Sequence, residues 1–173
     1  MKIAQQLLAE FQMQAPITRR FLERLPEDKY TWKPHAKSMS AGQLAYHLAF
    51  VPGAVIRAVE KDTAEAPGFN NFPEAKNRAE LLEIFDESVA VVSELLPRLD
   101  DAAMDHTWRL MAGGQEVLAQ PRKDFLRDVL FSHLYQHRGQ FGVYLRLLDV
   151  AVPASFGPSA DEPPRFVRKS QAA

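Results

Sequence analysis

Apolar residues recur at helical spacing in four long stretches of the chain, at about residues 3–25, 40–59, 77–99 and 121–148. In the third stretch the apolar positions follow alternating steps of three and four residues, which are typical of a helix packed in a bundle; they are Leu82, Phe85, Val89, Val92, Leu96 and Leu99. Four amphipathic helices of this length predict an all-α fold, a four-helix bundle.

Polar residues mark where several of these helices should begin. Ser40 and Gln43 have the spacing of a capping box, in which the hydroxyl and the amide each bind a backbone N–H of the first turn. Asn77 and Glu80 repeat that spacing at the third helix, and Pro121 suits the first position of the fourth. These signals fix the helix starts more tightly than the apolar pattern alone.

Two prolines fall inside predicted helices. Pro16 should kink the first helix about one turn earlier, and Pro52 followed by Gly53 should be a weak point in the second.

The connections suggest a small addition to the bundle and an irregular end. Residues 100–120 are long for a structureless link, and the pattern HTWRLMAGGQEVLA predicts a small hairpin turning at Gly113 and Gly114, in the loop before the last helix. After Asp149 the chain is rich in Pro, Gly and Ser. We therefore expect one helical domain over residues 1–150 and an irregular tail over residues 151–173, packed on the bundle or trailing from it.

Composition narrows the classes of protein that remain. A chain of 173 residues suits one domain, and 21 basic against 22 acidic residues, a net charge of −1, give no reason to expect a nucleic-acid partner. No apolar run approaches the roughly 20 residues that span a bilayer, so we expect a soluble protein without a membrane partner. The absence of cysteine excludes disulfides, thiolate metal ligands and a cysteine nucleophile, and it fits the cytoplasm.

Three histidines carry the candidate chemistry. His133 and His137 are four residues apart, which places two imidazoles on one helix face, and His47 lies on the apolar stripe of another predicted helix. Two histidines from one helix and one from a neighbour are a way to build a metal site in a bundle core. Three protein ligands leave a position open for water or substrate, as in catalytic sites.

The competing interpretation is three core histidines, each hydrogen-bonded separately. A buried ring without a partner costs about 1–3 kcal/mol, and inward-facing carboxylates are scarce here, so a shared cation is favoured. Neutral imidazoles suit Zn, Ni, Cu and Fe(II); three of them with an open fourth position suit Zn(II) best. Gln43 and Gln140 lie within about one turn of a ligand and Tyr144 about two turns after His137, and all three are candidates to orient the rings.

The remaining histidines and the tryptophans lie in predicted loops. His35 and His106 have no metal-ligand spacing to another histidine, so we expect both to face solvent. Trp32 and Trp108 suit buried loop anchors better than the lining of a pocket mouth.

Two segments, LERLPEDKYTWKPHAKSMSAGQLAYHLA and SHLYQHRGQFGVYLRLLDVAVPASFGPSADE, resemble the DinB-like (DinB/YfiT) four-helix bundle metalloproteins. The resemblance runs through most of the chain and implies that His47, His133 and His137 bind a divalent ion, often zinc or nickel. It also implies that homodimers are common, so we expect a homodimer. Members with assigned activity are transferases and isomerases that use a low-molecular-weight thiol such as bacillithiol or mycothiol. The lack of cysteine fits a thiol supplied from outside.

The leading hypothesis is therefore a metal-dependent enzyme that activates a thiol, in an S-transferase or isomerase reaction, or water, in a hydrolase, with an unknown small-molecule substrate. The alternative is a non-catalytic metal- or small-ligand-binding stress-response protein, because no general base is evident on the helix faces. A purely structural bundle is the third hypothesis.

Overall fold

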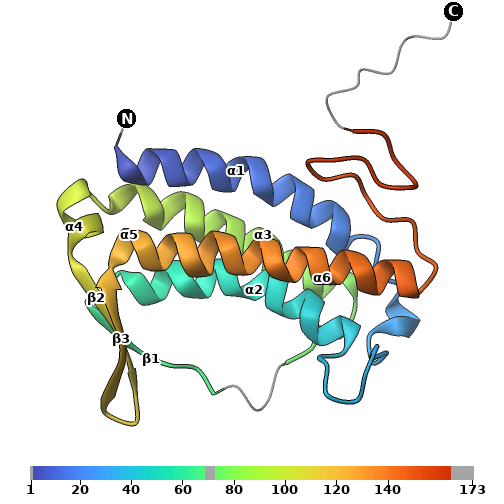
Figure 1. The fold of residues 1–173 in the computed structure, drawn as a ribbon, viewed down its shortest axis with the longest axis horizontal. Helices are drawn as coiled ribbons and strands as arrows, with labels where there is room; N and C mark the ends of the chain where they lie inside the picture. The colour runs from blue at the N-terminus through green and yellow to red at the C-terminus, as the bar shows by residue number, and fades with distance from the viewer. Residues whose placement is uncertain (1, 69–72, 165–173) are drawn as a thin grey trace, which may run out of the picture.

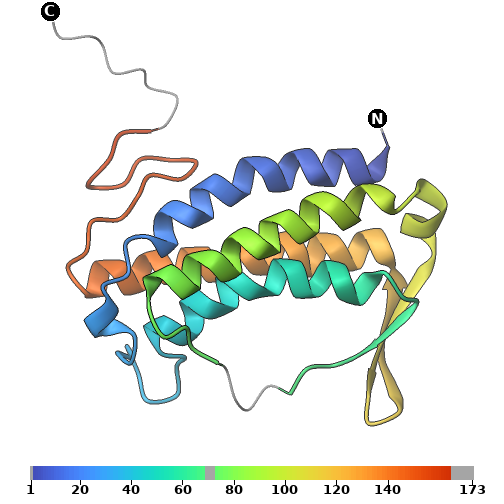
Figure 2. The same cartoon turned by 180° about the vertical axis from the view of Figure 1, so that it is seen from behind.

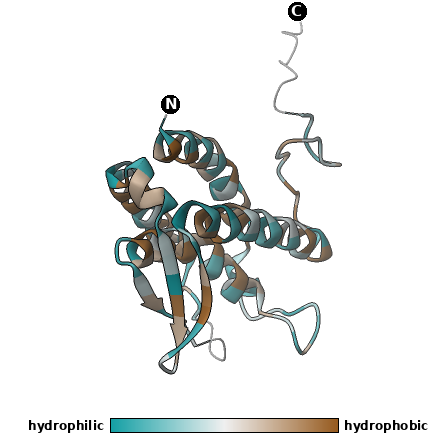
Figure 3. Ribbon diagram, turned by 60° about the vertical axis from the view of Figure 1, so that its left-hand side comes forward, coloured by the Kyte–Doolittle hydropathy of each residue, from teal (hydrophilic) through white to brown (hydrophobic). Residues whose placement is uncertain are grey.

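The computed structural model describes residues 2–68 and 73–164. Four long helical segments lie side by side, and the last of them is one continuous rod that begins as α5 and ends as α6 (Figures 1 and 2). The segments are α1 (Ile3–Leu22), α2 (Ala41–Val59), α3 (Arg78–Leu95) and the rod of α5 (Arg122–Phe125), a π-helical stretch (Leu126–Ser132) and α6 (His133–Leu147). Apolar and hydrophilic residues share each long helix, as the amphipathic pattern predicts (Figure 3).

The all-α prediction is wrong, because the described residues also form a three-stranded sheet at one end of the helices. Its strands are β1 (Thr63–Glu65), β2 (Thr107–Ala112) and β3 (Gln115–Pro121), in the order β1-β2-β3. β1 pairs parallel with β2, and β2 pairs antiparallel with β3. A three-residue strand has no readable alternation, and its partner lies beyond α3 and the short helix α4 (Asp101–Asp105) in the chain, so the residue pattern contains no sign of β1.

The hairpin expected before the last helix is present. Gly113 and Gly114 turn it with φ of 58° and 79°, a region that glycine enters without steric cost. Pro121 ends β3, and α5 begins one residue later than the proline signal predicts.

Trp108 joins the sheet to the helices. Its side chain is fully buried, its ring stacks on Phe125 with centroids 4.0 Å apart, and its Nε1 donates to the carbonyl of Ala58. The anchor role expected for this tryptophan is thus confirmed.

The predicted start of α2 is confirmed. The Ser40 hydroxyl accepts from the Gln43 N–H at 3.0 Å, and the Gln43 amide oxygen accepts from the Ser40 N–H at 2.9 Å. Further along, Gly53 lets α2 approach α3 closely, because a Cβ there would lie 2.9 Å from the Ser88 hydroxyl oxygen. Both features fix how α2 lies in the bundle.

The tail has no regular structure as far as residue 164 and is tied to the helices by two carboxylates; the rest of the predicted tail, residues 165–173, lies outside the described residues. Asp161 pairs with Arg146 of α6, while Glu162 pairs with Arg20 of α1 and, at 3.1 Å, with Arg24. No helix among the described residues has both the length and the apolar character needed to cross a membrane.

Candidate metal centre

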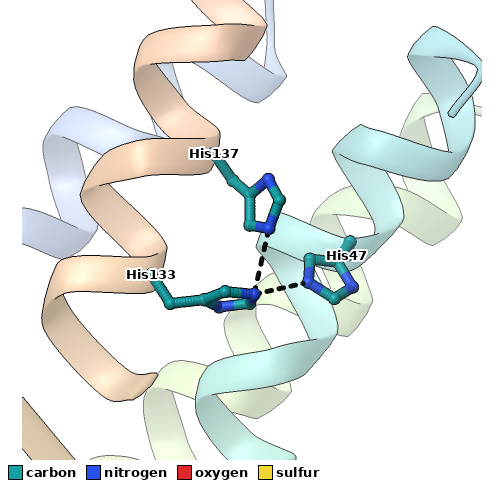
Figure 4. Close-up of side chains that lie close together, drawn as sticks. All are labelled: His47, His133 and His137. Atoms are coloured by element: carbon teal, nitrogen blue, oxygen red, sulfur yellow. Dashed lines mark hydrogen bonds between the residues drawn. The ribbon is translucent and has the colours of Figure 1, made fainter. Parts of the chain in front are cut away.

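The three histidines singled out in the sequence meet between α2 and α6 (Figure 4). His133 Nε2 lies 3.2 Å from His47 Nε2 and 2.9 Å from His137 Nε2. One ligand atom from each ring falls within 4.8 Å of the others, although His47 and His133 are 86 residues apart in the chain. The rings stand nearly edge to face, so their nitrogens point to one place.

Local structure explains the convergence. His133 and His137 are one turn apart at the start of α6, so their side chains leave the same face of the helix. His47 comes two turns after the capped start of α2, which lies beside α6 (Figure 1). The spacing in the sequence and the packing of two helices are sufficient to assemble the triad.

The two nitrogen separations that involve His133 fit ligands of one bound cation, and the three ligand atoms all lie within 4.8 Å of one another. Bonds of 2.0–2.1 Å to a tetrahedral ion place ligand nitrogens about 3.3 Å apart, and octahedral geometry places adjacent ones about 3.0 Å apart. Both separations given above fall close to these values. A neutral ring nitrogen either donates or accepts, so three facing Nε2 atoms cannot all be satisfied by one another, whereas a single cation accepts all three lone pairs.

Burial keeps the three rings uncharged. It lowers the pKa of His47 to about 4, with further lowering from the nearby His137 and His133. Burial, and then His137, lowers the pKa of His133 to about 4. Burial also lowers the pKa of His137, while a hydrogen bond to Gln140 raises it. Neutral imidazole is the form that binds a metal ion, so the rings are ready to act as ligands near pH 7.

Gln140 fixes the protonation of one ring. His137 Nδ1 lies 2.7 Å from Gln140 Oε1, and since a carbonyl oxygen only accepts, Nδ1 carries the proton and Nε2 keeps its lone pair for the centre of the triad. Gln43 has its amide oxygen in the capping box of α2 with Ser40. Gln140 thus contacts a ring of the triad, and its role in orienting that ring for a metal ion stays a prediction.

Tyr144, the third candidate, contacts the loop before α2. Its hydroxyl donates to the Met39 carbonyl at 3.3 Å, and its ring meets Trp32 edge-on with centroids 5.6 Å apart. Outside the triad, His35 is exposed and the His106 side chain is 53% exposed, 3.6 Å from Asp62, as expected for solvent-facing histidines.

A small hollow adjoins the triad. Its volume is about 10 Å³, which suits one water-sized particle. Besides the three histidines, its described lining is entirely apolar and offers no acid or base: Leu48, Val51, Pro52, Val129, Leu130 and Leu134.

Two buried arginines, Arg122 and Arg138, escaped the sequence analysis, and Arg138 directly follows a histidine of the triad. The pattern predicts Arg138 outside the inward face of its helix, but its exposed fraction is only 6%. One guanidinium nitrogen donates to the Thr18 hydroxyl at 3.2 Å, and the group lies over the rings of Tyr135 and Phe156. Burial lowers the pKa of Arg138, and nothing in the spacing of the charged residues signals this position.

The π-helical stretch was also missed, although the sequence contains a sign of it. The buried pair Phe125 and Leu126 is followed five residues later by the buried pair Leu130 and Phe131. A π-helix bonds each N–H to the carbonyl five residues earlier, which matches this separation, whereas an α-helix bonds to the carbonyl four residues earlier.

The sequence model of the DinB superfamily matches residues 10–141, a range that contains all three histidines. The chain belongs to the DinB superfamily. It is 25% identical over 143 residues to the uncharacterized protein YjoA of Bacillus subtilis (strain 168), which covers 82% of this chain and 88% of YjoA.

Solved structures of DinB-like proteins share the fold. A DinB-like protein from Bacillus cereus ATCC 10987 matches with a TM-score of 0.68 and 15% identity, covering 86% of this chain and 95% of that one. The crystal structure of Bacillus subtilis YjoA matches with a TM-score of 0.64 and 22% identity, with the same coverage. At these identities the likeness establishes the fold, and function has to be argued from the site.

Proposed function

We propose that this DinB-family protein binds one divalent ion, zinc or nickel, through His47, His133 and His137, and that the site activates an external low-molecular-weight thiol in an S-transferase or isomerase reaction. The convergence of three neutral imidazoles on one point supports the metal. Family membership is consistent with this chemistry, which the resemblance in the sequence implies. Formation of a homodimer and location in the cytoplasm remain predictions.

The protein's own groups would hold the ion and leave it open on one side. His133 and His137 supply two ligands from a single rigid helix turn, and His47 supplies the third from across the helix interface. Gln140 keeps the proton of His137 on the nitrogen that points away from the centre. A bound divalent ion would lower the pKa of a coordinated thiol, so that thiolate is present at neutral pH.

The apolar hollow favours a thiol over water as the activated group. Hydrolysis usually draws on a positioned acid or base, and the described lining offers none besides the triad. A thiol with an ordinary pKa near 8.5 needs a smaller shift than water, which starts at about 15.7. The chain has no cysteine, so the thiol must come from a separate molecule.

The same observation supports one alternative. A site without an acid or base also suits a non-catalytic metal- or small-ligand-binding stress-response protein. The two functions differ in whether a bound thiol is consumed.

The first test is metal content, measured by elemental mass spectrometry on protein purified without an affinity tag. We expect about one equivalent of zinc or nickel per chain, and none in the double variant His133→Ala, His137→Ala. His106→Ala is the matched control, because it removes an exposed histidine outside the triad and should keep the metal. Parent protein without metal, even after incubation with both ions, would refute the proposal.

The second test separates the functions. Protein loaded with cobalt or nickel is mixed with a small thiol, and a sulfur-to-metal charge-transfer band is expected if sulfur binds the ion. Consumption of the thiol with electrophilic substrates supports the transferase, turnover of esters without thiol supports a hydrolase, and a bound but unreacted thiol supports the binding protein.

A further inference from the structure

The two helices that carry the triad are both irregular where they line the hollow. In α2, Pro52 has no N–H, so the carbonyl of Leu48 lacks the bond that position i+4 normally supplies. Leu48 and Pro52 both line the hollow. The ladder of backbone hydrogen bonds in α2 is therefore interrupted within one turn and a half of His47.

Across the hollow, the opposite wall belongs to the π-helical stretch. Val129 and Leu130 lie in this stretch and line the hollow, and the N–H of His133 binds the carbonyl of Asp128, five residues earlier. π-Helical turns are rare, and those that interrupt α-helices are frequently found at functional sites. Two unrelated irregularities, on separate helices, thus face each other across the same space.

The size of the hollow makes these walls important. A volume of about 10 Å³ admits one water-sized particle, so a larger molecule enters the hollow only when a wall moves. Local opening is easiest where backbone hydrogen bonds are missing or weak. On its side away from the hollow, the same part of α2 is held against α3. Gly53 lies close to Ser88, and the Ser88 hydroxyl donates to the Phe50 carbonyl.

We propose that the turn Leu48–Pro52 and the facing π turn form a gate to the hollow, and that molecules enter the hollow between Pro52 and Val129 when these two turns open locally. The inference rests on the proposed metal centre only for its second readout. Backbone opening, its first readout, is measured without any metal.

The test restores a regular backbone on each side. Pro52→Val supplies the missing N–H and keeps an apolar side chain in the wall. Pro16→Val is the matched control, since Pro16 also interrupts a helix but is exposed on α1, away from the hollow. Deletion of Arg127, an exposed residue of the π stretch, is the second variant, because it brings the two buried pairs to the four-residue spacing of an α-helix.

The first readout is amide hydrogen exchange of the metal-free proteins. We expect exchange in residues 44–55 to slow about tenfold in Pro52→Val, exchange in residues 126–134 to slow similarly in the deletion variant, and neither to slow in Pro16→Val. Unchanged exchange in both gate variants, or equal slowing in the control, would overturn the gate.

The second readout is the loss of zinc to the chelator 4-(2-pyridylazo)resorcinol. We expect release to be about tenfold slower in Pro52→Val than in the parent and unchanged in Pro16→Val. Equal release rates in all three proteins would contradict the gate even if the metal centre is real. A parent that binds no zinc would refute the metal centre, and the exchange data would then decide the gate alone.

Discussion

Gln140 offers the sharpest test of how the triad is built. Its amide oxygen accepts from His137 Nδ1 at 2.7 Å, while the side chain itself is exposed. Replacement by leucine keeps the size and removes the acceptor. The His137 ring can then turn, and its proton can move to Nε2, the nitrogen that faces the other two rings. Nε2 then no longer offers its lone pair to a metal ion.

The expected loss follows from groups that orient metal-bound histidines elsewhere. Removing such a partner weakens metal binding about 10- to 100-fold, which corresponds to about 1.4–2.7 kcal/mol. The free energy of unfolding of the metal-free protein should change by only about 0.5–1.5 kcal/mol, the contribution of one hydrogen bond. The loss in metal affinity should thus exceed the loss in stability.

The assay is zinc affinity by competition with a chromophoric chelator, with thermal unfolding of the metal-free protein alongside. Gln136→Leu is the matched control, because Gln136 is exposed on the same helix and no contact with the triad is among those described for it. Gln140→Glu should retain or strengthen binding, since a carboxylate is the stronger acceptor. If Gln140→Leu binds zinc as tightly as the parent, Gln140 does not orient His137 and the reasoning is wrong.

Three further predictions concern the fold around the site. Trp108→Ala should lower the free energy of unfolding by about 3–5 kcal/mol in denaturant titration, because a fully buried indole leaves a cavity. Ser40→Ala should cost about 1 kcal/mol in the same assay, by removing the cap of α2. The Ala154 N–H, and then Arg20, lower the pKa of Glu162. The contribution of Glu162 to stability is therefore present above its ordinary pKa of 4.5 and is lost as pH falls through the lower pKa of the folded protein. Proteolysis of the tail should accelerate over that acidic range, and should accelerate less in Glu162→Gln.

The parts of the fold that the sequence predicted are those set by local chemistry. Ser40 and Gln43 bind one another's backbone within a single turn, and Gly113 and Gly114 supply the positive φ that a tight hairpin needs. The three-residue strand β1 could not be predicted in this way. Its only support is a parallel partner distant in the chain, and three residues carry no periodicity of their own.

In the site, too, the features set by local geometry could be predicted from the sequence and the others could not. The pairing of His133 with His137 follows from helix geometry, and the meeting with His47 follows from the packing of two apolar stripes. The contact of Gln140 with His137 could not be singled out from the sequence, since Gln43 also lies within about one turn of a ligand histidine but uses its amide oxygen for capping. Side-chain hydrogen bonds depend on rotamers, which spacing does not determine.

The buried guanidinium of Arg138 helps to orient the helix that carries His133 and His137. Burying an arginine whose described partners are a hydroxyl and two aromatic rings stabilises the fold less than an apolar side chain of similar size would. Apolar contacts, however, tolerate small rotations of a helix, whereas the bonds from Arg138 to Thr18 and from Tyr135 to Glu10 are directional. These bonds join α6 to α1 on the side of α6 away from α2. They therefore fix the rotation of α6 about its own axis at which His133 and His137 face His47.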